Sequence, residues 1–152
     1  MEEPLFHITG RVERDCGFTL SQLQAMDMVE TDAMLLACGD GQPLGAIQGV
    51  RGVLLADIIN ETKVINKEHN DTKKMYIVVR AEDEYRVVFS WQEVFNTVVG
   101  EGVIVILERG GEPVYTNTGK VDLFSAQDTL TGPRYVKSLS TVTICILDED
   151  AP

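Results

Sequence analysis

The sequence predicts a mixed α+β domain, and two patterns in it support this. Short runs of strand-forming residues recur along the chain, as in LFHITGRV near the start and STVTICIL near the end. Between them lie segments whose apolar residues repeat at helical intervals, and two of these segments begin with a capping box. We therefore expect mixed β-sheets with three or so short helices, in one domain over residues 1–152.

The first half of the chain is expected to alternate strands and helices. Thr19 and Gln22 have capping-box spacing, which predicts a short amphipathic helix. Leu54, Leu55, Ile58 and Ile59 form two i, i+4 pairs, as in a helix with one buried face. The expected elements, in order, are strand LFHITG, helix FTLSQLQAM, buried strand AMLLACG, a glycine-rich connection and helix VLLADIINET.

The second half is expected to consist mainly of hairpins. Ser90 and Glu93 form a second capping box, so a helix should begin at Ser90. Gly110 and Gly111 can supply the left-handed backbone of a tight turn. The expected elements are a polar loop ETKVINKEHNDTKK, hairpin MYIVVR/YRVVF, the helix from Ser90, hairpin GVIVILERGGEPV, and closing strands KVDLFSAQ and STVTICIL.

Composition limits the partners that this chain can have. The 152 residues carry 24 acidic and 13 basic side chains, a formal net charge of -11. This charge repels phosphate backbones, so nucleic acids and anionic membranes are not expected partners. No apolar run approaches membrane-spanning length. The start MEEPLFHITG lacks a signal-peptide pattern, but a leader could have been removed, so the compartment stays open.

Cysteine and histidine usage excludes several common metal sites. Cys16, Cys38 and Cys145 stand far apart without a Cys-x-x-Cys pair, which argues against a zinc ribbon and favours reduced thiols. The chain has 2 histidines, too few for a histidine-rich centre. The glycines of CGDGQPLG match neither nucleotide-binding loop pattern.

One segment collects groups that bind anions. In TGPRYVKSLS, Arg134 and Lys137 stand three residues apart beside Ser138, within an otherwise acidic chain. A guanidinium grips phosphate through two hydrogen bonds, and an ammonium adds a point charge. The alternative is a solubilising pair on the surface, and spacing alone favours this alternative.

The order of these segments resembles the molybdopterin-binding domain of the sulfite oxidase family. The resemblance covers most of the chain, from about residue 6 to residue 146. The segments that carry it are FHITGRV with FTLSQLQAM, GVRGVLLADII, YIVVRAEDEYRVVFSWQEVF, ILERGGEPV and RYVKSLSTVTI. Each is weakly specific by itself, and their common order gives the resemblance its weight.

The resemblance implies a pyranopterin cofactor with a phosphate group, and a cysteine thiolate that coordinates molybdenum. Cys38 is the candidate metal ligand, although aligning Gly39 with the family's glycine would move Ala37 to that position. The family's arginine in the turn after this cysteine is absent, and Asp40 stands in the turn instead. Four further residues are implied as cofactor contacts, namely Arg51, Arg134, Lys137 and Ser138.

Three functions follow as alternatives from the resemblance. The first is a minimal module that binds a molybdopterin-type cofactor. The second is an interaction domain that keeps the scaffold without a cofactor. The third is a small molybdenum oxidoreductase that exchanges electrons with a partner protein.

Overall fold

The computed structural model describes residues 2–32, 34–37 and 43–148. The first sheet holds, in spatial order, β2 (Cys16–Phe18), β1 (Phe6–Gly10), β12 (Leu139–Ile146), β7 (Met75–Ala81) and β8 (Arg86–Ser90). The second holds β10 (Glu112–Pro113), β9 (Val103–Arg109), β6 (Val50–Leu54) and β3 (Val29–Glu30), with β11 (Asp122–Ser125) also paired to β9. A separate hairpin is made by β4 (Met34–Ala37) and β5 (Pro43–Ile47).

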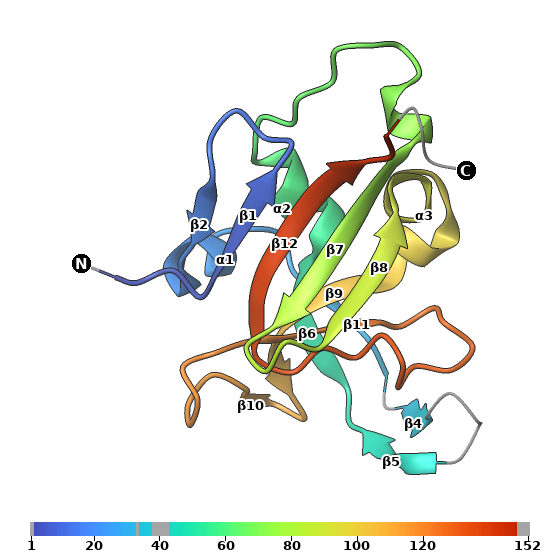
Figure 1. Cartoon of the computed structure of the whole chain (residues 1–152). Coiled ribbons are helices and arrows are strands. Elements are labelled where there is room, and N and C mark those ends of the chain that lie inside the picture. The colour runs from blue at the N-terminus through green and yellow to red at the C-terminus, as the bar shows by residue number, and fades with distance from the viewer. Residues whose placement is uncertain (1, 33, 38–42, 149–152) are drawn as a thin grey trace.

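Helices connect and cover the sheets. They are α1 (Leu20–Gln24), α2 (Leu55–Asn60) and α3 (Trp91–Asn96), with the 3-10 helices η1 (Asp71–Lys73) and η2 (Val98–Gly102). In Figure 1 the first sheet faces the viewer, and α2 and the second sheet lie behind it. The expected α+β class with three short helices is confirmed.

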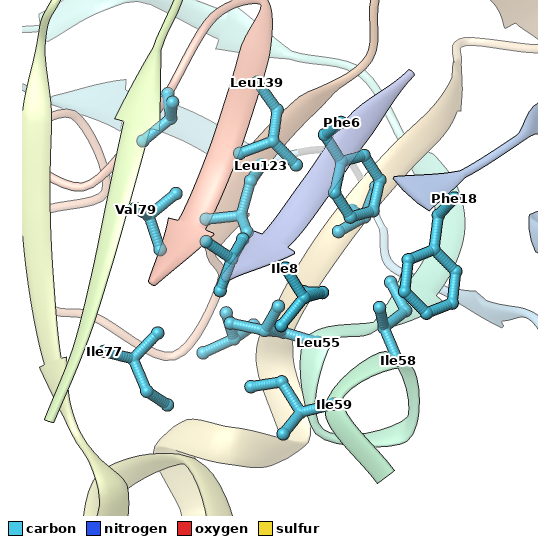
Figure 2. Packing of buried hydrophobic residues seen from close by; sticks show 14 of the residues in the cluster. Phe6, Ile8, Phe18, Leu55, Ile58, Ile59, Ile77, Val79, Leu123 and Leu139 are labelled. Atoms are coloured by element: carbon cyan, nitrogen blue, oxygen red, sulfur yellow. The ribbon is translucent and has the colours of Figure 1, made fainter. Parts of the chain in front are cut away.

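The core lies between the first sheet and the elements behind it. Figure 2 shows side chains of β1 and β7 directed toward those of α2. Leu55, Ile58 and Ile59 of α2 have no exposed surface, so the helix buries the face that its spacing predicts. Burying each such side chain is worth about 1.5–3 kcal/mol. The hydrophobic pattern therefore fixes α2 against the sheet.

Both capping boxes form as expected. Thr19 accepts a hydrogen bond from the N–H of Gln22, and the side chain of Gln22 accepts one from the N–H of Thr19. Ser90 and Glu93 make the same reciprocal pair at the start of α3. These bonds satisfy N–H groups that would otherwise lack partners at the helix ends.

The glycine-rich connection differs from expectation, because it contains two strands, β5 and β6. Leu54 belongs to the end of β6, so α2 begins one residue later, at Leu55. Glycine at position 52 permits this strand to lie close to β9: a Cβ there would lie 2.0 Å from the carbonyl oxygen of Val105. Glycine permits this close pairing but also lowers the strand propensity of the segment. For this reason the sequence did not predict β6.

Candidate functional site

The predicted metal ligand, Cys38, lies outside the residues that the structure describes. It follows directly after β4, whose last residue is the alternative, Ala37. The choice between these two positions stays a prediction. No group of three or more His, Cys, Asp or Glu side chains suited to a metal occurs within residues 2–32, 34–37 and 43–148.

Arg51 lies on β6 and is held between two carboxylates. Its Nε is 3.4 Å from Glu30, and its Nη1 is 3.3 Å from Glu108. All three side chains line a cleft of about 300 Å³ that also includes Gly49 and Gly111. The guanidinium is reachable from solvent, but its charge is already balanced.

Arg134 lies in the connection between β11 and β12, the 126–138 loop, and is bound by two acidic side chains. Nε donates to Asp128 at 2.8 Å and Nη2 donates to the other oxygen of Asp128 at 2.7 Å. Nη2 also donates to Glu93 at 3.2 Å. Hydrogen bonding to Asp128, against the opposing effect of burial, raises the pKa of Arg134.

The same side chain ties the 126–138 loop to the edge of β8. Nη1 of Arg134 donates to the carbonyl oxygen of Val88 at 3.1 Å, and the guanidinium stacks 4.2 Å from the ring centre of buried Phe89. The hydroxyl of Tyr85 donates to the carbonyl of Pro133 nearby. Arg134 therefore cross-links the loop, β8 and the start of α3. Its role in binding phosphate stays a prediction, and phosphate would have to compete with groups already bound.

Lys137 and Ser138 are placed differently. Lys137 is exposed, and its ammonium makes no ion pair within the described part of the chain. Ser138 has a φ of 55°, and its N–H donates to Asp122 at 3.0 Å. Its carbonyl accepts a hydrogen bond from the N–H of Glu82 at 2.9 Å. These two hydrogen bonds hold the backbone at Ser138, directly after Lys137.

Asp122 and Arg109 form a polar cluster with the 126–138 loop that the sequence analysis did not predict. Asp122 accepts hydrogen bonds from Nη2 of Arg109 at 3.1 Å and from the hydroxyl of Tyr135 at 2.8 Å, besides the N–H of Ser138. Nε of Arg109 is buried and has no hydrogen-bond partner among the described residues. No sequence signal marks this cluster, because its members come together through the pairing of β9 with β11.

The exposed ammonium of Lys137 can meet an anion, whereas Nε of Arg109 is buried and the Arg109 guanidinium already pairs with Asp122. An ammonium of this kind attracts a phosphate group as a point charge. In the described ranges, no helix has the length and apolar character needed to cross a membrane.

This arrangement of sheets and helices also occurs in a larger protein of known structure. The chain is similar to the crystal structure of sulfane dehydrogenase SoxCD from Paracoccus pantotrophus, with a TM-score of 0.66 and 15% identity. The match covers 96% of this chain and 39% of that one, so this chain spans well under half the length of its neighbour. No protein-family model and no curated protein sequence matches the chain. The similarity establishes a related fold.

Proposed function

We propose that this chain binds a molybdopterin-type cofactor, as a small domain of the sulfite oxidase type. The observation that carries the proposal is the fold match to SoxCD over 96% of the chain. The order of the sequence segments supports the same assignment independently. When bound, such a cofactor supplies a redox-active metal, so the domain could serve in an oxidoreductase system.

The residues of this chain would hold the cofactor at its phosphate end. Lys137 supplies an exposed ammonium that makes no ion pair with any residue the structure describes. Ser138 is held in place by Asp122, and its hydroxyl is the predicted hydrogen-bond donor. Arg134 holds the loop in place. Its guanidinium binds the phosphate only if the phosphate displaces the carboxylate of Asp128 or Glu93 from it. Cys38 remains the proposed thiolate ligand, and Arg51 a further cationic contact.

A second candidate function is an interaction domain on the same scaffold without a cofactor. It is favoured by the pairing of Arg51 and Arg134 with carboxylates of the chain itself. Neutralised guanidinium groups need no external anion, because their hydrogen bonds are satisfied internally. Cofactor uptake separates the two functions.

Replacing Lys137 tests the proposed phosphate contact. Lys137→Ala should weaken the uptake of molybdopterin by about 1–3 kcal/mol, because one charge-assisted hydrogen bond is lost. Uptake can be followed by the fluorescence change of the pterin during titration of the folded protein.

The matched control is Lys67→Ala, which removes another exposed lysine, from the loop before η1. In Figure 1 that loop lies at the top of the view, and the 126–138 loop, in dark orange, lies in the lower half. Equal losses for both variants would show a general charge effect and contradict the proposed contact.

A further inference from the structure

Arg134 directs the anion-binding edge of its guanidinium at a carboxylate of its own chain. Nε and Nη2 can hold one anion through two parallel hydrogen bonds, and both donate to Asp128, at 2.8 and 2.7 Å. A phosphate group that binds an arginine in this way uses the same two donors. Asp128 therefore occupies the place that the phosphate of a ligand would take on Arg134.

Two further contacts hold the guanidinium without using this edge. Nη1 donates to the carbonyl oxygen of Val88 at 3.1 Å, and the guanidinium carbon lies 4.2 Å from the ring centre of Phe89, which is buried. Neither contact involves Nε or Nη2, so both can remain when Asp128 leaves. Arg134 is therefore held in position to receive an anion in place of Asp128.

Of the two carboxylates on the guanidinium, Asp128 is the one that can move. It lies in residues 126–134, which form turns and bends without a helix or strand. Its local partner is Ser125, through a side-chain hydrogen bond of 2.8 Å and a backbone one of 3.3 Å. Glu93 is held more firmly, because its other oxygen accepts the N–H of Ser90 in the capping box of α3. An entering anion should therefore displace Asp128 first.

The ion pair lies within reach of solvent. The side chains of Arg134 and Asp128 are 21% and 13% exposed. An anion that approaches Arg134 while Asp128 is in place finds the two donors already bound and is repelled by a negative charge. Binding therefore depends on how often the carboxylate releases the guanidinium.

We propose that Asp128 is an autoinhibitory carboxylate, which occupies Arg134 until a phosphate group displaces it. The inference deepens the proposed function and rests on it for the class of anion. The 126–138 loop then has two states, one with Asp128 on Arg134 and one with phosphate there. The apparent affinity for phosphate is lowered in proportion to the fraction of molecules in which Arg134 is released.

The test measures binding of inorganic phosphate to the full chain at constant ionic strength, followed by phosphorus NMR. Asp128→Asn removes the competing charge and keeps the shape of the side chain, so phosphate should bind at least about tenfold more tightly. The melting temperature of this variant should fall, because an ion pair is lost. A purely structural ion pair predicts the loss of stability without the gain in binding.

Three further variants locate the gain. Asp128→Asn combined with Arg134→Met should lose it, because the released cation is gone. Glu93→Gln should give a smaller gain and keep the capping box, since glutamine can also accept the N–H of Ser90. It also serves as the test if Asp128→Asn does not fold. The control is Glu112→Gln, which removes an exposed carboxylate without an ion pair among the described residues.

Three outcomes would overturn the proposal. The first is unchanged phosphate binding in the folded carboxylate variants. The second is an equal gain in Glu112→Gln, which would show an effect of net charge. The third is a gain that persists without Arg134, which would place the phosphate elsewhere.

Molybdopterin in place of phosphate separates this inference from the proposed function. Equal uptake of the pterin by the wild type and by Asp128→Asn would keep the proposed function and contradict autoinhibition. The predicted gain in phosphate binding, without uptake of the pterin by any variant, would support autoinhibition and contradict the proposed cofactor.

Discussion

At the residue scale, Arg134 shows how a side chain predicted to bind a ligand can also hold the fold. The sequence places it three residues before Lys137, and this spacing suggested an anion-binding segment. Its partners could not be predicted, because Glu93 lies 41 residues away and meets it through tertiary packing. Lys137, three residues further along the loop, is exposed. Spacing alone therefore cannot distinguish the two roles.

Removing the Arg134 cross-link should destabilise the domain. Arg134→Met leaves Asp128 and Glu93 without their cation, so the free energy of unfolding should fall by about 1–3 kcal/mol. Urea denaturation measures this change. Arg86→Met, which removes an exposed arginine without an ion pair among the described residues, should have little effect. A similar loss for both would refute the cross-link.

Asp71 should give the stability a measurable pH dependence. The N–H of Glu68 contributes most to holding the pKa of Asp71 below its usual range, burial opposes it, and the N–H of Lys67 and the charge of Arg11 add to the lowering. Because the pKa is lower in the folded state, the stabilisation is present above the unfolded pKa of about 4 and is lost as pH falls through the folded value.

The corresponding variant is Asp71→Asn. Its melting temperature should lie below that of the wild type near pH 6, and the difference should shrink below about pH 4. Glu68→Gln, an exposed carboxylate in the same loop, is the control. A difference that stays constant over this pH range would contradict the assigned role of Asp71.

At the element scale, local signals located most helices and hairpins. The capping boxes at Thr19 and Ser90 fixed where α1 and α3 begin, since each depends only on residues three apart. The turn at Gly110 and Gly111 formed with positive φ at both positions, as expected. β5 and β6 were missed because their strand character depends on neighbours rather than on local pattern.

Gly52 tests whether that close strand pairing is needed. Gly52→Ala should destabilise the domain strongly, because its Cβ would collide with the backbone of β9. Gly111→Ala is the comparison: its Cβ would meet open space, so only the strain of a φ of 83° opposes it. Thermal unfolding of both variants measures the two effects. A smaller decrease in melting temperature for Gly52→Ala than for Gly111→Ala would contradict the packing described.

At the scale of the whole molecule, the sequence order of the segments indicated a fold that their individual patterns could not. β1 and β12, from opposite ends of the chain, pair in parallel at the centre of the first sheet. Alternation identified both strands, yet no local pattern could predict that they are neighbours. The resemblance predicted the fold as a whole, and the similarity to SoxCD agrees with that prediction. The cluster around Asp122 escaped both, since it depends on contacts of single side chains.

The most direct test of the proposed function is the cofactor content of the protein purified from a host that makes molybdopterin. We predict about one pterin per chain, with molybdenum or tungsten detected by elemental analysis, and loss of the metal signal in Cys38→Ser. Folded protein from that host without pterin or metal, under conditions that load a known molybdopterin enzyme, would contradict cofactor binding and favour the interaction domain.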